Sequence, residues 1–169
     1  MRLYAGKITA ISHESVKDLL AAGDIEAESP KEVEADLASV LNQYLATERD
    51  VNERTKDLLE RTGRPNSEYS RVRLQIAESK GIKVGDEMLD YLLDQVVEMF
   101  HHSNNVDEIF AADVVLRKKM ANVFKRHLAV DADLDAEVRG QLKHLREGAR
   151  EWDIEYARVL EQVKRRRGL

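Results

Sequence analysis

One stretch decides the fold: residues 29–65 read SPKEVEADLASVLNQYLATERDVNERTKDLLERTGRP. Its first four residues form a capping-box pattern, in which the Ser29 hydroxyl accepts a hydrogen bond from a free amide and Glu32 reaches back to another. Pro30 suits the first helical position, where its missing N–H is not needed. No helix breaker follows until Gly63, so the pattern predicts one helix of about 33 residues, roughly 50 Å long.

Apolar side chains recur along this helix at intervals of three and four residues, the spacing of a single helical face. The stripe pauses at Glu48, Arg49 and Asp50, and a bend in the helix would lie there. The stripe consists of Val33, Leu37, Val40, Leu41, Tyr44, Leu45, Val51, Leu58 and Leu59, with Thr55 on the same face.

The same stripe returns 83 residues later in the sequence. The polar pause returns with it, at Asp131 and Asp133, and Trp152 takes the place of Tyr69. Upstream, Val16 and Leu19 match Val97 and Phe100 at an offset of 81 residues. The matching pairs are Val33 with Leu116, Leu37 with Met120, Val40 with Val123, Leu41 with Phe124, Tyr44 with His127, Leu45 with Leu128, Val51 with Leu134 and Leu59 with Leu142.

Shorter helices are expected around the two long ones. Glycines or polar clusters bound each of them, and Asp86 is a plausible cap of the fourth. Residues 24–36 carry six acids, which we interpret in part as helix-start chemistry, and residues 107–111 could form one isolated turn. The expected ranges are 6–22, from near Ser67 to Gly81, 87–102 and 150–166, with the second long helix at 114–146.

These patterns predict an all-α protein built from two similar three-helix units, each short–long–short, that form a helical bundle. The first unit is residues 1–83 and the second is residues 84–169, and the match between them indicates internal duplication. The alternative is that any two amphipathic helices can be slid into register.

The composition agrees with this fold and excludes several classes of protein. The 169 residues include no cysteine, which excludes disulfide frameworks, iron–sulfur clusters, thiolate zinc sites and cysteine nucleophiles. The net charge of −5 argues against a general nucleic-acid or membrane coat, although not against a local basic patch. No secretory signal, membrane-spanning stretch or lipidation motif is recognisable, so we expect a cytoplasmic protein with no membrane partner.

Several segments together resemble a known family. They are the opening Met1 to Leu3, the acid-rich long helix, the run REWDIEY at 150–156 and the ending KRRRG at 164–168. This chain resembles, over essentially its whole length, the bacterial family catalogued as domain of unknown function 507. The resemblance implies a helical fold in a bacterial cytosolic setting, and it implies no activity, substrate or catalytic residue.

The candidate metal and catalytic groups are better explained structurally. Glu98 and His101 have the spacing of one half of a di-metal pair, but no second pair exists, so we interpret His101 and His102 as helix-end groups. The acids at 131–135 imitate a calcium loop without its glycine or final glutamate. His127 lies on the apolar stripe and is expected to be semi-buried and hydrogen-bonded. We therefore predict no catalytic, cofactor or metal site and no enzyme activity.

The remaining candidates are basic side chains, which could touch an anion or nucleic acid or could simply complement helix dipoles and solvent. Our first hypothesis is a cytosolic interaction or scaffold protein that binds a protein partner or a copy of itself. The alternative is a nucleic-acid- or ribosome-associated module that uses the basic C-terminal tail. The basic candidates are Arg117, Lys118, Lys119, Lys125, Arg126, Lys164, Arg165, Arg166 and Arg167.

Overall fold

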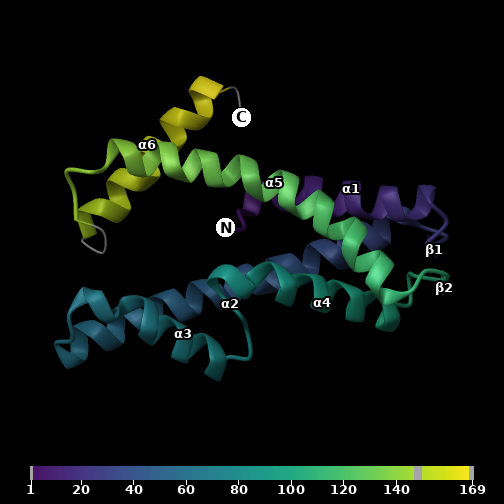
Figure 1. Ribbon diagram of the computed structural model, residues 1–169, viewed down its shortest axis with the longest axis horizontal. Coiled ribbons are helices and arrows are strands. Elements are labelled where there is room, and N and C mark those ends of the chain that lie inside the picture. Colours follow the sequence, from purple (N-terminus) through teal and green to yellow (C-terminus); the bar gives the residue numbers. More distant parts are fainter. Residues whose placement is uncertain (1, 147–149, 168–169) are drawn as a thin grey trace. The chain divides into compact units, whose positions relative to one another are not determined.

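The computed structural model describes residues 2–146 and 150–167, and for residues 129–132, 150 and 153 it describes the backbone alone. Helices account for most of the described residues, so the protein is all-α, as predicted (Figure 1). Their order along the chain is α1 (Ile8–Ala21), α2 (Pro30–Thr62), α3 (Tyr69–Ser79), α4 (Met88–His102), α5 (Asp113–Gln141) and α6 (Arg150–Arg167).

Two short strands correct the prediction for the loops. β1 (Ile25–Glu26) pairs antiparallel with β2 (Glu108–Ile109), where we expected helix-start chemistry and an isolated turn. The pairing continues beyond the ladder, because the amides of Asp107 and Phe110 donate to the carbonyls of Glu26 and Asp24, each at 2.8 Å. Strands of two residues have no periodicity, and the partner lies more than 80 residues away, so no local pattern reveals them.

Helix ends agree with the predicted helix-breaking glycine, whereas the predicted capping side chains make no capping hydrogen bond. Gly63 ends α2 with a φ of 66°, which a residue without a side chain adopts at little cost. Ser29 lies at the cap position of α2, but its side chain makes no capping hydrogen bond; its carbonyl instead accepts from the Glu32 and Val33 amides. Asp86 lies in a 3₁₀ turn, Gly85–Glu87, that precedes α4, and makes no capping bond there.

Both long helices are continuous. α2 passes through Glu48 without a break in its helical backbone, and α5 passes through the equivalent region. The prediction for the end of α5 is wrong by five residues, because the helix stops at Gln141 and residues 142–145 form turns. There the Leu142 amide donates to the Arg139 carbonyl at 3.1 Å and the Leu145 amide to the Leu142 carbonyl at 2.9 Å.

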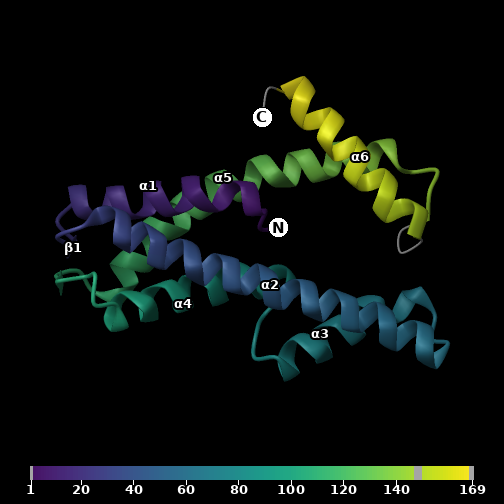
Figure 2. The same ribbon diagram turned by 180° about the vertical axis from the view of Figure 1, so that it is seen from behind.

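Packing divides the chain into two compact units, residues 3–127 and residues 1–2 with 128–169. In the first unit, α1 and α4 pack on α2, and α3 lies along the C-terminal half of α2 (Figure 2). These two units are defined by contacts between residues. The boundary predicted at residue 83 is defined by similarity between two segments of the sequence, and it stays a prediction. The core of the first unit includes Leu3, Ile11, Leu19, Leu37, Leu41, Leu92, Phe100, Leu116, Met120 and Phe124.

The second unit is a helical hairpin made by the C-terminal part of α5 and by α6. Its aromatic side chains make two specific contacts. Trp152 stacks on Tyr156 with ring centroids 5.0 Å apart, and the Arg139 guanidinium lies 5.3 Å from the Trp152 ring centroid. The buried core is Leu134, Val138, Leu142, Tyr156, Val159 and Val163, with Leu145, Trp152 and Leu160 packed against it.

Candidate functional site

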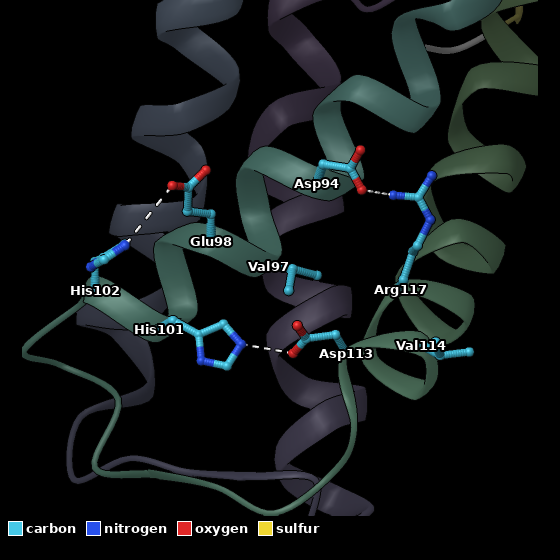
Figure 3. Close-up of a pocket in the computed structure, with 8 residues that line it drawn as sticks. All are labelled: Asp94, Val97, Glu98, His101, His102, Asp113, Val114 and Arg117. Atoms are coloured by element: carbon cyan, nitrogen blue, oxygen red, sulfur yellow. Dashed lines mark hydrogen bonds and ion pairs between the residues drawn. The ribbon is translucent and has the colours of Figure 1, made fainter.

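A groove of about 480 Å³ lies between α4 and the start of α5. α4 presents polar residues here because its wide apolar face, from Met88 to Phe100, turns into the core and leaves positions 90, 94 and 98 outside. The lining residues, shown in Figure 3, are Asp94, Val97, Glu98, His101, His102, Asp113, Val114 and Arg117.

Ion pairs border this groove. His101 Nε2 lies 2.7 Å from Asp113 Oδ1, so the helix-end histidine does pair locally. The Arg117 guanidinium bridges two carboxylates of α4, pairing with Asp94 and lying 2.9 Å from Asp90 Oδ1. These groups are largely exposed, and each such pair contributes at most about 1 kcal/mol. These pairs position the side chains at the edge of the groove, and they do not form a buried reaction centre.

The charge around the groove is negative. Four carboxylates, Asp90, Asp94, Glu98 and Asp113, surround a single full cation, Arg117. The remaining bases are the imidazoles of His101 and His102, which lie 2.7 Å from Asp113 and 3.9 Å from Glu98, so four carboxylates face three bases. The groove therefore attracts cations and repels phosphate.

An apolar edge adjoins the groove. Phe110 is 59%, Val114 is 76% and Val115 is 39% exposed, and these are three of the five large apolar side chains that the described residues expose. The sequence pattern does not reveal this edge, because residues 107–111 resemble an isolated turn and the apolar stripe begins only at Leu116. The available signal was that Val114 and Val115 precede that stripe, at positions that lie off it.

Three of the predicted basic candidates hold helices together. Besides Arg117, Lys119 Nζ lies 2.5 Å from Asp24 Oδ2, and an Arg126 terminal nitrogen lies 3.2 Å from Glu14 Oε2. These cations are therefore engaged inside the first unit and do not form an open patch. Sequence reasoning could not foresee this, because each partner lies between 23 and 112 residues away.

The other basic candidates are divided between paired and unpaired side chains. Arg166 and Arg167 both pair with Glu137 in the α5–α6 hairpin. Within the described part of the chain, Lys118, Lys125, Lys164 and Arg165 make no ion pair. Lys118 and Lys125 are seven residues apart, two turns of α5, and so share one helical face.

His127 is semi-buried and paired, as expected from its place on the stripe. Its Nε2 lies 3.1 Å from Glu14 Oε2, which connects α5 to α1. This hydrogen bond from His127, together with the nearby charge of Arg126, holds the pKa of the Glu14 carboxyl below its ordinary value. The histidine therefore acts as a helix-to-helix contact.

A buried polar network connects α2 to α3, which the sequence did not reveal. Glu48 is only 8% exposed and lies 3.2 Å from both the Tyr44 hydroxyl and an Arg73 nitrogen. The Tyr44 hydroxyl donates to the Lys83 carbonyl at 2.9 Å, and Arg73 Nε donates to Asn52 Oδ1 at 2.7 Å. Burial raises the pKa of Tyr44 far above its usual range.

A second cavity of about 400 Å³ lies beside this network, between α2 and α4. Tyr44 and Tyr91, with ring centroids 6.0 Å apart, form part of its wall, and Gln43 and Gln95 supply neutral amides. Its one cation, Lys80, lies 3.1 Å from Asp50 and is already paired.

The described residues contain no group of three or more histidine, aspartate or glutamate side chains that could hold a metal ion. The calcium-loop imitation includes Asp131 and Ala132, whose side chains lie outside the described residues. Among the described helices, none combines the length and the apolar character needed to cross a bilayer.

A comparison with curated proteins finds no match. The family model described as "Protein of unknown function (DUF507)" matches residues 1–169, which is the whole chain and the family that the terminal segments resemble. This protein therefore belongs to the DUF507 family.

Proposed function

We propose that this protein is a non-enzymatic interaction module of the bacterial cytoplasm, and that it binds another protein through the face formed by α4 and the start of α5. The observation that carries the proposal is the exposure of three large apolar side chains within six residues, Phe110, Val114 and Val115, of which Val114 lines the groove. Apolar side chains gathered on one surface are typical of binding sites, whereas single exposed ones are common and uninformative.

Co-purification tests this function. The tagged full chain is expressed in cells of its own organism, and the proteins that co-purify are quantified. We expect a stoichiometric partner that is lost with Val114→Lys and kept with Ile154→Lys, a matched change at another exposed apolar residue. Both changes should alter the free energy of unfolding by less than about 0.5 kcal/mol. Equal recovery with both variants would contradict the proposed face.

A second copy of the chain is one possible partner, which light scattering distinguishes. A dimer that dissociates on Val114→Lys would make the interaction homotypic. A strict monomer at all workable concentrations would leave a different protein as the partner.

We also propose that residues 1–83 and 84–169 are diverged copies of one three-helix unit. Burial supports this: the six buried residues of α1 each correspond to a buried residue of α4 at an offset of 81. Six buried residues of α2 likewise correspond to buried residues at an offset of 83, five of them in α5 and one, Leu142, in the turn after it. These pairs are Val33 with Leu116, Leu37 with Met120, Leu41 with Phe124, Val51 with Leu134, Thr55 with Val138 and Leu59 with Leu142.

Contacts between helices repeat in the same way. Asn105 Nδ2 donates to Asp36 at 2.9 Å, and the equivalent positions, 24 and 119, carry the pair of Asp24 with Lys119. The same holds for a second contact: His13 lies 3.0 Å from Glu34, and the equivalent positions, 94 and 117, carry the pair of Asp94 with Arg117. The charges are exchanged while the positions are kept, as expected when two copies diverge but conserve their packing.

The strand pairing also supports the repeat. At an offset of 83, β1 and β2 are equivalent segments, so each strand pairs with its own counterpart. The register, Ile25 with Ile109 and Glu26 with Glu108, is the one that a two-fold axis through the ladder would produce. The offset changes from 81 to 83 between Asn105 and β2, where Val106 and Asp107 are the two extra residues.

The alternative function is nucleic-acid or ribosome binding by the basic side chains that remain unpaired, notably Lys164 and Arg165. Its test is RNA binding across salt by the wild type and by Lys164→Ala with Arg165→Ala, which leaves the pairs of Glu137 intact. Two lost phosphate contacts should flatten the log–log salt dependence by about 1.4 on single-stranded RNA. Absent or unchanged binding would remove this alternative.

A further inference from the structure

We infer that the groove between α4 and α5 receives an amphipathic helix of a partner protein, one whose apolar side chains are flanked by lysine and arginine. The inference rests on the protein-binding function proposed above and adds the chemistry of the partner.

The groove offers an apolar strip between two polar borders. Val97 lies on its floor, and Figure 3 shows this side chain between the His101–Asp113 pair and the Arg117–Asp94 pair. Val114 extends the apolar surface on the α5 side and is almost fully exposed. An apolar strip between two helices is the surface on which a third helix buries one face of its own.

The charges around that strip favour basic residues on either side of the apolar face of the partner helix. Asp90, Asp94 and Glu98 follow one another at four-residue intervals on α4, about 6 Å apart along the helix axis. Arg117 pairs with Asp90 and Asp94, and His102 Nε2 lies 3.9 Å from Glu98, so three carboxylates face two bases and acidic groups remain in excess. Lysine or arginine at i and i+4 on a partner helix has the same spacing, and such complementarity raises association rates and specificity.

The same charges argue against two other occupants. Phosphate would be repelled, which disfavours nucleic acid at this groove. The most basic helix of a second copy, α6, is already engaged, because its apolar side is buried against α5 and Arg166 and Arg167 pair with Glu137.

The equivalent face of the first half keeps the helix-to-helix contact of Asp94, as His13 with Glu34, but it lacks the row of acids. There Thr9, His13 and Lys17 take the positions of Asp90, Asp94 and Glu98, and Lys31 takes that of Val114. The acids and the exposed valine are therefore features of one half alone. They also provide substitutions, Glu98→Lys and Val114→Lys, that a position of the same kind already tolerates.

The test uses a fluorescent 15-residue peptide of leucine and lysine, with leucine at i, i+3, i+4 and i+7, and the full chain. Controls are a peptide of the same composition in scrambled order and one with glutamate in place of lysine. Amide chemical shifts locate the site, and fluorescence anisotropy measures the Kd. The variants are Val114→Lys, Glu98→Lys and the matched control Ile154→Lys.

We expect the leucine–lysine peptide to bind, with shifts concentrated in residues 94–117. Val114→Lys and Glu98→Lys should each weaken it at least tenfold, and Ile154→Lys should not. The inference is overturned if this peptide fails to bind, if the scrambled or glutamate peptide binds as well, or if neither groove variant changes the Kd. A co-purifying partner that is sensitive to Val114→Lys, together with failure of this peptide, would retain the proposed function and remove only the basic-helix partner.

Discussion

The two helical hairpins of this protein bury residues that lie 83 positions apart in the sequence, but different interactions hold each hairpin together. The C-terminal half of α2 buries Val51, Thr55 and Leu59. The residues 83 positions later are also buried, at 134 and 138 in α5 and at 142 in the turn that follows it. α3 is held to α2 partly by a buried polar network around Glu48 and Arg73. α6 is held to α5 mainly by apolar and aromatic side chains.

The difference follows from how much each short helix can bury. α3 has 11 residues, of which Val72 and Ala77 are buried, so apolar contact alone specifies its position weakly. α6 has 18 residues and buries three large apolar side chains, among them Tyr156. In the α2–α3 hairpin, directional hydrogen bonds supplement the small apolar contact in fixing the position of α3. In the α5–α6 hairpin, apolar packing alone is sufficient to fix the position of α6.

The largest effect is expected in the apolar hairpin. Leu142→Ala removes a buried side chain from the α5–α6 core and should lower the free energy of unfolding by about 3 kcal/mol. Urea unfolding followed by the fluorescence of Trp152, the only tryptophan in the chain, measures it within this unit. Leu74→Ala, at an exposed position of α3, is the matched control and should cost under about 0.5 kcal/mol. Equal effects of the two would contradict the assigned core.

The polar hairpin should respond nearly as strongly to the loss of one partner. Glu48→Ala leaves the Arg73 guanidinium and the Tyr44 hydroxyl without their carboxylate and should cost about 2 kcal/mol, less than a fully buried pair because Arg73 is partly exposed. Replacing both partners, Glu48→Leu with Arg73→Met, should recover most of that loss. Circular dichroism in urea measures both variants. If the double variant is as unstable as the single one, the network does not act as described.

Exchanging residues between equivalent positions sharpens the comparison further. Val138→Thr brings a hydroxyl into the apolar hairpin and should cost about 1 to 2 kcal/mol, because the hydroxyl loses its water. Thr55→Val removes a hydroxyl that only bonds its own helix, at 2.7 Å from the Val51 carbonyl, and should be neutral or stabilising by under about 1 kcal/mol. Thermal unfolding measures the stability of both variants. A Thr55→Val variant that is clearly less stable than the wild type would show that positions 55 and 138 are not equivalent.

The smallest effect concerns the contact between α1 and α5. The pKa of Glu14 is lower in the folded protein than its ordinary value of 4.5, so its contribution to stability is present above that value and is lost as the pH falls through the folded pKa. Glu14→Gln should therefore destabilise slightly at pH 7, and by less as the pH falls below 4.5. The effect stays small because the Glu14 side chain is 40% exposed and screened. A difference that grows as the pH falls would contradict this assignment.

Much of the helical architecture could be predicted from the sequence, because apolar stripes and glycine breakers are local signals. Gly63 and Gly81 end helices where expected, and the wide apolar face of residues 87–102 is buried as expected. The buried role of Glu48 could not be predicted. A carboxylate within a polar pause resembles a solvated group until Arg73, 25 residues later, is brought beside it.

The candidate site was less accessible to sequence reasoning for the same reason. The basic residues of α5 look like a patch in sequence, yet Arg117, Lys119 and Arg126 are paired with acids from α4, the first loop and α1. The exposure of Val114 depends on which side of α5 faces the core, which the stripe only partly indicates. A position-by-position comparison of the two halves distinguishes the proposed binding face from the positions that are buried in both.

Paired photo-crosslinking in living cells determines whether the surface around Val114 contacts another protein. A photoreactive amino acid is placed at position 114 in one variant and at position 31, its counterpart in the first half, in the other. The account predicts a discrete crosslinked protein from position 114 and little or none from position 31. Equal crosslinking at the two positions, or none at position 114, would contradict it.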